Sequence, residues 1–171
     1  MGRLEVVSGN IFNYLDDKDL IVNSANKYMI CGGGICGAIY KKANKDLLED
    51  YCKHNFKEYM KINEVRFSPG FELGLDILHI CSPKYYESKE PLKDLLDSYN
   101  NVVVEAKKKG YKSIVSVSLG CGVNGYKHND IAKAIICKLN ELVNKYDIDF
   151  MLVLPSEEIK EFYSIYNSKG L

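Results

Sequence analysis

The chain contains 171 residues, of which 46% are hydrophobic and 27% are charged, and this composition is typical of a folded globular protein. It excludes disordered, collagen-like and small disulfide-stapled chains. The 23 basic residues balance the 23 acidic residues, so general binding to nucleic-acid phosphates is disfavoured. No apolar run approaches the ~18 residues of a membrane span, and the first residues show no signal peptide. Six cysteines fit the reduced thiols of a cytoplasmic protein, and the length predicts one domain over residues 1–171.

Short apolar runs rich in branched residues alternate along the chain with longer segments that carry apolar residues at helical spacing. The short runs predict strands over residues 4–7, 20–22, 65–67, 77–81, 114–119 and 150–154. The longer segments predict one or two helices over residues 35–59 and single helices over residues 91–109, 129–146 and 156–166. This alternation predicts an α/β domain with a mostly parallel central sheet, helices on both faces and a ligand beyond the carboxyl ends of the strands.

Turn and cap residues bound several of these elements. Ser68-Pro69-Gly70 predicts the turn that joins the third and fourth strands as a pair. The expected helix start and stop residues are Pro91, Gly110, Asn129 or Asp130, and Ser156. His79 lies inside an apolar strand, so we expect a buried structural histidine whose hydrogen bonds are satisfied.

Two glycine-rich loops, at residues 32–37 and 120–125, each follow a predicted strand and precede a predicted helix. Both match the pattern G-x-G-x-x-G, in which bare backbone N–H groups can close on a phosphate without a side chain in the way. Two such loops at two strand ends indicate a site that clamps a pyrophosphate. A Rossmann dinucleotide site is disfavoured, because no strand ends in Asp or Glu ~20 residues after the first loop. Kinase or NTPase chemistry is disfavoured, because neither loop continues into Gly-Lys-Ser/Thr.

Two amide side chains, Asn23 and Asn26, lie at the end of the second predicted strand, just before the first glycine loop. An amide can both donate to and accept from sugar hydroxyls, so we expect this pair close to the phosphate site. The alternative is that Asn26 is only a turn or cap residue.

Several segments, in their order and spacing, resemble the ADP-ribose-binding macrodomain family, most of all its MacroD-type and coronavirus-type members. These segments are Gly9-Asn10-Ile11, residues 21–26, residues 32–39, Ile77-Leu78-His79, Ser82-Pro83 and Gly122-Val123-Asn124-Gly125-Tyr126. The resemblance, which covers residues 4–166, implies a three-layer α/β/α fold with a mixed, mostly parallel sheet. It implies that the ligand is ADP-ribose or an ADP-ribosylated protein, with no cofactor and no metal. The implied activities are removal of mono-ADP-ribose from Asp or Glu side chains and deacetylation of O-acetyl-ADP-ribose.

The resemblance also assigns roles to single residues. Asn10 stands where the family has an Asp that accepts a hydrogen bond from the adenine amino group, so weaker adenine selectivity is expected. The implied catalytic residues are Asn26, which fixes the distal ribose, together with Gly34 and Cys36. The residues implied to contact the ligand are Asn10, Ile11, Asn23, Ala25, Asn26, Gly32, Gly33, Gly34, Ile35, Cys36, Ser118, Gly120, Cys121, Gly122, Val123, Asn124, Gly125, Tyr126, Leu154 and Pro155.

Two positions depart from the family pattern. Cys36 stands where many hydrolytic macrodomains have an Asp that can activate water, and a thiol with a reference pKa of about 8.5 is mostly protonated at neutral pH. Coronavirus-type macrodomains, however, have Ala there and still hydrolyse. Asn124 replaces the usual Phe or Tyr that packs against the distal ribose, and Leu154 and Pro155 stand where the family often has an aromatic against the adenine.

Three hypotheses remain: an ADP-ribosyl hydrolase, an ADP-ribose reader without turnover, and a nucleic-acid module that the neutral net charge disfavours. A zinc site formed by Cys31, Cys36 and Cys121 lacks the C-x-x-C spacing, so packed reduced thiols are favoured instead.

Overall fold

In the computed structural model, which describes residues 1–169, six strands form one sheet in the order β1-β6-β5-β2-β4-β3. The strands are β1 (Leu4–Ser8), β2 (Leu20–Ser24), β3 (Val65–Ser68), β4 (Asp76–Ile80), β5 (Ser113–Val117) and β6 (Asp149–Leu154). Neighbouring strands are parallel except β3 and β4, in which Val65 lies opposite Ile80. The predicted α/β fold with a mixed, mostly parallel sheet is therefore confirmed.

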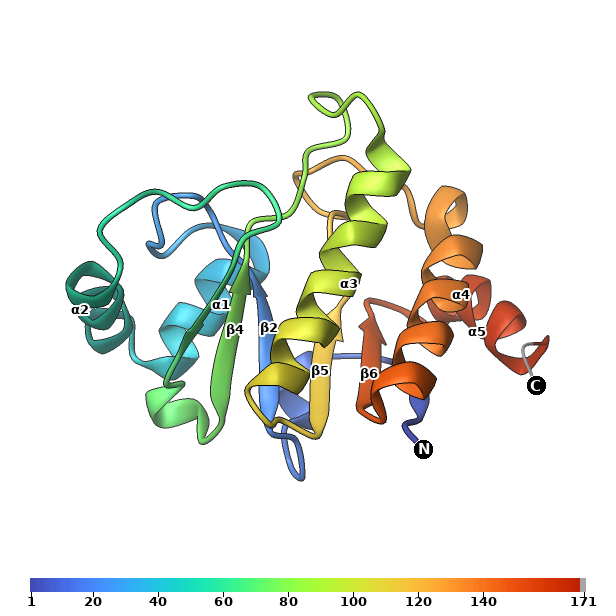
Figure 1. Cartoon of the computed structure of the whole chain (residues 1–171), viewed down its shortest axis with the longest axis horizontal. Coiled ribbons are helices and arrows are strands. Elements are labelled where there is room, and N and C mark those ends of the chain that lie inside the picture. The colour runs from blue at the N-terminus through green and yellow to red at the C-terminus, as the bar shows by residue number, and fades with distance from the viewer. Residues whose placement is uncertain (170–171) are drawn as a thin grey trace.

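Helices cover both faces of the sheet (Figure 1). The α-helices are α1 (Gly34–Ala43), α2 (Lys45–Asn55), α3 (Pro91–Lys108), α4 (His128–Tyr146) and α5 (Glu157–Lys169), and two short 3-10 helices are η1 (Ile11–Tyr14) and η2 (Phe71–Leu73). Side chains alternate between the faces of a strand. In β2, Leu20 and Val22 therefore join the core beneath α3, α4 and α5, whereas Ile21 joins the core beneath α1 and α2.

Two of the predicted connections differ in the structure. The helical segment 35–59 forms two helices that meet at Asn44, whose φ of 102° ends α1 and whose side chain caps α2. Residues 56–59 follow the end of α2 and are not helical. The turn Ser68-Pro69-Gly70 is only the start of a longer connection between β3 and β4, because η2 lies within it.

The prediction of Asn129 or Asp130 as the cap of α4 is wrong. The helix begins at His128, and the residue at the N-cap is Lys127, whose side chain makes no capping hydrogen bond. Asp130 lies in the first turn, where its charge favours the positive end of the helix dipole.

The other predicted helix ends are confirmed. Pro91 lies in the first turn of α3, and Gly110, with a φ of 88°, follows the end of that helix. Ser156 precedes α5, and its Oγ accepts a hydrogen bond from the backbone N–H of Ile159 at 3.2 Å.

The carboxyl ends of the parallel strands meet at one edge of the sheet, at the top of the view in Figure 1. Along this edge the order of strands is β1, β6, β5 and β2, so the segments that follow Ser8, Leu154, Val117 and Ser24 come in the same order. The segment after β1 and the end of β6 are joined directly, since the N–H of Gly9 donates to the carbonyl of Leu154 at 2.9 Å. The sheet thus brings together the segments that the sequence analysis selected.

His79 is fully buried in β4 and bonded at both ring nitrogens. Asn23 Nδ2 donates to Nδ1 at 3.0 Å, and Nε2 lies 2.8 Å from the Oγ of Ser68. Burial, together with the positive charge of Arg66, lowers the pKa of His79 to about 3. The prediction of a satisfied structural histidine is confirmed, and the ring is neutral in the folded protein near pH 7.

Acid should therefore destabilise the fold through His79. The unfolded chain binds a proton at the ordinary histidine pKa of about 6.5, whereas the folded chain does not until about pH 3. The contribution of His79 to the free energy of unfolding is fully present above pH 6.5. Below that pH it decreases by up to about 1.4 kcal/mol per pH unit. Urea unfolding between pH 6.5 and 4.5 tests this prediction. The free energy of unfolding of His79→Gln should change less steeply with pH than that of the wild type. Identical slopes in the two proteins would contradict it.

Candidate functional site

Loop 1 (residues 25–33) joins β2 to α1 and presents bare backbone at the sheet edge. Gly32, Gly33 and Gly34 are exposed, and Gly33 is the N-cap of α1. The first N–H groups of a helix have no partner within the helix, and the helix dipole adds a partial positive charge there. This end of α1 therefore has the free donors and the dipole that an anion site needs, while the neighbouring Ile35 packs partly into the core beneath it.

Gly37 explains how loop 1 lies so close to the first turn of α1. A Cβ atom at Gly37 would stand 2.3 Å from the carbonyl oxygen of Gly32, far inside any real contact. By contrast, a Cβ at Gly33 would meet nothing within 4 Å. Glycine at position 37 therefore shapes the loop, whereas glycine at position 33 leaves open space in front of it.

Loop 2 (residues 118–127) joins β5 to α4 beside loop 1. Gly120 adopts a φ of 81°, and a Cβ there would lie 2.7 Å from the ring of Tyr126. Tyr126 is buried, and its hydroxyl donates to the carbonyl of Pro91 at 2.6 Å. Tyr126 thus supports loop 2 from behind, while Gly122 and Val123 are exposed at its tip.

Asn26 folds loop 1 back on itself. Its Oδ1 accepts from the N–H groups of Tyr28 at 3.1 Å and Ile30 at 3.4 Å, and its Nδ2 donates to the carbonyl of Ile30 at 2.7 Å. The same Nδ2 lies 4.0 Å from the sulfur of Cys36. Asn26 is half-buried and acts as a turn residue of loop 1, while its contact with a ligand stays a prediction. The preceding residue, Ala25, is buried.

Asn23 lies beneath loop 1 and is completely buried. Its Nδ2 donates to His79 and also lies 3.7 Å from the sulfur of Cys36, while its Oδ1 has no hydrogen-bond partner among the described residues. The predicted contact between the Asn23 side chain and a ligand is therefore not supported. Asn23 instead links the structural histidine to the base of the loop.

Cys36 is buried in the first turn of α1. Burial raises the pKa of its thiol, and this effect outweighs the opposing hydrogen bonds from the Gly32 backbone and from Asn23. The Cys121 thiol in loop 2 has its pKa raised by burial as well. Both groups are therefore protonated thiols at neutral pH, and neither can serve as a general base there.

A chain of polar side chains behind loop 2 escaped the sequence analysis. The hydroxyl of Tyr163 lies 2.8 Å from His128 Nδ1 and 3.0 Å from Ser118 Oγ, which in turn lies 3.2 Å from the sulfur of Cys121. Tyr163 comes from α5 and His128 from the start of α4. Ser118, predicted to touch the ligand, is buried in this chain. No local sequence signal marks partners that are 45 residues apart.

The segment between β4 and α3 also meets loop 2, which the sequence did not indicate. The N–H of Tyr85 donates to the carbonyl of Asn124 at 2.8 Å, and the ring of Tyr85 packs edge-on against Tyr126. The ring of Tyr86 stands 3.3 Å from the place where a Cβ at Gly125 would lie, yet Tyr86 is 84% exposed. An aromatic ring therefore lies next to loop 2 although Asn124 itself is not aromatic.

The other end of the sheet edge is formed by the segments after β1 and β6. Asn10 is exposed at the start of η1, where its Oδ1 accepts from the N–H of Phe12 at 3.0 Å. Ile11 and Leu154 are buried, whereas Asn10 and Pro155 next to them are exposed. Neither Leu154 nor Pro155 is aromatic, and the nearest aromatic residue along these segments is the half-buried Phe12 of η1.

Within residues 1–169 there is no cluster of three or more His, Cys, Asp or Glu side chains placed to hold a metal ion. In the same part of the chain, no helix combines the length and the apolar character needed to cross a membrane.

Known proteins share this sequence pattern and fold. Residues 22–135 match the family model of the Macro domain. The chain is 26% identical over 168 residues to an O-acetyl-ADP-ribose deacetylase of Salmonella typhimurium, covering 95% of this chain and 92% of that protein. It is 29% identical over 159 residues to a macro domain-containing protein of Xanthomonas campestris, covering 89% of this chain and 87% of the other.

Solved structures agree. The Oceanobacillus iheyensis macrodomain with ADP superposes with a TM-score of 0.87 at 27% identity, covering 98% of this chain and 91% of that one. The fold of a Trypanosoma brucei macrodomain, solved in complex with ADP-ribose, matches with a TM-score of 0.80 at 22% identity, covering 95% of this chain and 68% of that one. The family match spans most of the sheet and both glycine loops, and the chain belongs to the Macro domain family.

Proposed function

We propose that the chain binds ADP-ribose along this sheet edge and hydrolyses the ester that links mono-ADP-ribose to Asp or Glu side chains. The observation that carries the proposal is the placement of loops 1 and 2 after the paired strands β2 and β5. Between two bare glycine backbones the diphosphate finds N–H donors from both sides. The adenine then lies toward Asn10, and the distal ribose lies toward Asn26.

Positioning is the main source of catalysis in this proposal. A water molecule attacks the anomeric carbon of the distal ribose, the bond from that carbon to the carboxylate oxygen breaks, and the carboxylate leaves with the bonding electrons. A carboxylate needs no general acid, since its conjugate acid has a pKa near 4. The diphosphate of the substrate orients the attacking water, whose proton passes to the solvent. Asn26 orients the ribose, and the Cys36 thiol takes no part in proton transfer.

Two relatives support the choice of ligand and of ester chemistry. The Oceanobacillus iheyensis macrodomain was solved with ADP, and the Salmonella typhimurium relative is named an O-acetyl-ADP-ribose deacetylase. The acetyl group of O-acetyl-ADP-ribose is also held by an ester, but its removal needs attack of water at the acetyl carbonyl. This compound is therefore a second substrate that tests a different point of attack.

The test is release of ADP-ribose from a protein mono-ADP-ribosylated on Asp or Glu, followed by chromatography. Release that depends on Asn26 is the expected result. A protein that is retained on an ADP-ribose resin but releases nothing would be a reader instead. That second function is favoured by one observation, the buried protonated thiol of Cys36 at the position of a frequent catalytic Asp. Failure to bind ADP-ribose at all would contradict both functions.

Cys36→Ala should lower the rate of release by only a few-fold, about 2- to 5-fold, through lost packing beneath loop 1 rather than through lost proton transfer. The pH dependence of the rate between pH 6 and 8 should keep its shape, because the thiol does not titrate in that range. Initial rates of wild type and variant across this range provide the measurement. A loss of about 100-fold, or a changed pH profile, would show that the thiol takes part in the chemistry.

A further inference from the structure

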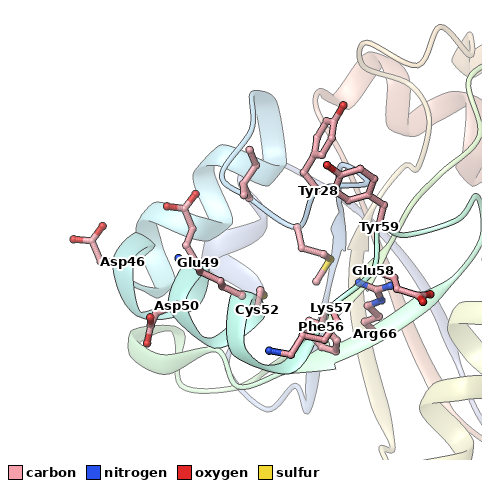
Figure 2. A pocket seen from close by; sticks show the side chains of 13 residues that line it. Tyr28, Asp46, Glu49, Asp50, Cys52, Phe56, Lys57, Glu58, Tyr59 and Arg66 are labelled. Carbon is pink, nitrogen blue, oxygen red and sulfur yellow. The ribbon is translucent and has the colours of Figure 1, made fainter.

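A cavity of about 570 Å³ lies beside loop 1, between α2, the segment 56–59 and the residues that follow Asn26 (Figure 2). Tyr28, Met29 and Ile30 line it from the side of loop 1. The amide of Asn26 holds this same stretch through the N–H groups of Tyr28 and Ile30. One short segment therefore separates the place proposed for the distal ribose from the cavity, and whatever is attached to that ribose leaves the site in this neighbourhood.

Arg66 of β3 lines the cavity with an unsatisfied donor. Its side chain is only 10% exposed, its Nε donates to Glu64 at 2.7 Å, and its guanidinium lies over the ring of Phe56 at 5.1 Å. Its Nη1 is buried and has no hydrogen-bond partner among the described residues. An arginine cannot give up its charge, so Nη1 gains its missing hydrogen bond only when a ligand that enters the cavity shifts this side chain and supplies an acceptor.

The charges around the cavity decide which kind of acceptor fits. Its cationic lining residues are Lys53, Lys57 and Arg66, and its acidic lining residues are Asp46, Glu49, Asp50 and Glu58. Positive charge is therefore not in excess, and a free phosphate, which carries nearly two negative charges, is disfavoured. A neutral carbonyl oxygen satisfies the Nη1 donor without meeting repulsion from the acidic side of α2, and a peptide backbone supplies such carbonyls.

An aromatic pair at the mouth of the cavity also suits a polypeptide. The rings of Tyr28 and Tyr59 meet edge to face with centroids 4.9 Å apart, and the Lys27 ammonium lies over both, at 5.1 and 5.9 Å. The two tyrosines are nevertheless 50% and 66% exposed. Figure 2 shows both on the side of the cavity opposite the acidic side chains of α2. Ordered, exposed tyrosines are characteristic of surfaces that bind protein chains.

We propose that this cavity binds the polypeptide segment next to the ADP-ribosylated side chain of a protein substrate. A backbone carbonyl of that segment accepts from Arg66 Nη1, and an apolar side chain packs against Phe56 and Tyr59. The inference rests on the proposed binding of ADP-ribose and extends it from the nucleotide to the protein that carries it. The molecule then recognises a modified protein at two adjacent places.

Titration calorimetry with free ADP-ribose and with a peptide that carries ADP-ribose through a linkage resistant to hydrolysis tests this inference. The wild type should bind the modified peptide about 10-fold more tightly than ADP-ribose, because the second contact is intramolecular. Tyr59→Ala should reduce this ratio by about 3-fold or more and leave the affinity for free ADP-ribose unchanged. Arg66→Gln should act in the same direction, and if that variant does not fold, Tyr59→Ala decides alone.

Phe162→Ala is the matched control, since Phe162 is a partly exposed aromatic residue on α5 and does not line the cavity. It should leave both affinities as in the wild type. Equal affinity of the wild type for peptide and ADP-ribose would overturn the inference, as would a ratio that survives Tyr59→Ala. In both cases the binding of ADP-ribose would stand. No binding of free ADP-ribose by the wild type would instead contradict the proposed function.

Discussion

Asn26→Ala is expected to lower the rate of ADP-ribose release by about 10²- to 10³-fold, which is the size of effect found when a positioned catalytic hydrogen-bond donor is removed. The physical reason is double. The variant loses the amide that the proposed function assigns to the distal ribose, and it loses the three hydrogen bonds that fold the stretch from Asn26 to Ile30. Because loop 2 and the end of the edge near Asn10 are untouched, the affinity for ADP-ribose should fall much less than the rate.

Single-turnover rates with saturating enzyme give the measurement, and calorimetry with ADP-ribose separates binding from chemistry. Asn140→Ala is the matched control, because Asn140 donates a side-chain hydrogen bond to Asn167 on the far helices and is not part of the edge. Its rate should equal that of the wild type. If Asn26→Ala released ADP-ribose as fast as the wild type, Asn26 would be a turn residue only, and the hydrolytic proposal would lose its positioning group.

The parts of the site that the sequence predicted are those whose signal is local. A glycine loop after a strand and before a helix is visible in six consecutive residues, and the structure places both loops at the same edge of the sheet. Asn26 could be selected from the sequence because it lies at a strand end just before the first glycine loop, and three of its hydrogen bonds lie within four residues. The alternation of strands and helices likewise predicted the layers, because the inner strands β2, β4, β5 and β6 are short runs of mostly buried residues.

The parts that sequence reasoning missed depend on contacts between distant segments. Asn23 was expected at the ligand, but it lies in the buried strand β2 and bonds to His79, which is 56 residues away. The support of loop 2 by Tyr163, and the unsatisfied donor of Arg66 beneath α2, also arise from packing between elements. The sequence could not decide between one and two helices over residues 35–59. The break depends on the positive φ of Asn44, which helix propensity alone does not require.

Gly37→Ala should destabilise the fold and abolish measurable binding of ADP-ribose. Two effects oppose each other at this position. Alanine is favoured over glycine within a helix by about 1 kcal/mol, but its Cβ would stand 2.3 Å from the Gly32 carbonyl oxygen. That oxygen belongs to the backbone and cannot rotate away, so loop 1 must shift as a unit. Overpacking of this kind costs about 1–3 kcal/mol, and the clash here is severe enough that we expect it to exceed the gain in helix propensity.

Gly33→Ala separates loop geometry from ligand contact. A Cβ at Gly33 meets nothing within 4 Å, and its φ of −91° suits any residue, so its free energy of unfolding should match the wild type within about 0.5 kcal/mol. A loss of ADP-ribose binding in Gly33→Ala would then report a ligand against loop 1, since the fold is intact. Urea unfolding and calorimetry on both variants give the comparison. A Gly37→Ala protein more stable than the wild type would show that the gain in helix propensity exceeds the cost of moving loop 1. The close contact between loop 1 and α1 would then not be what aligns the backbone donors.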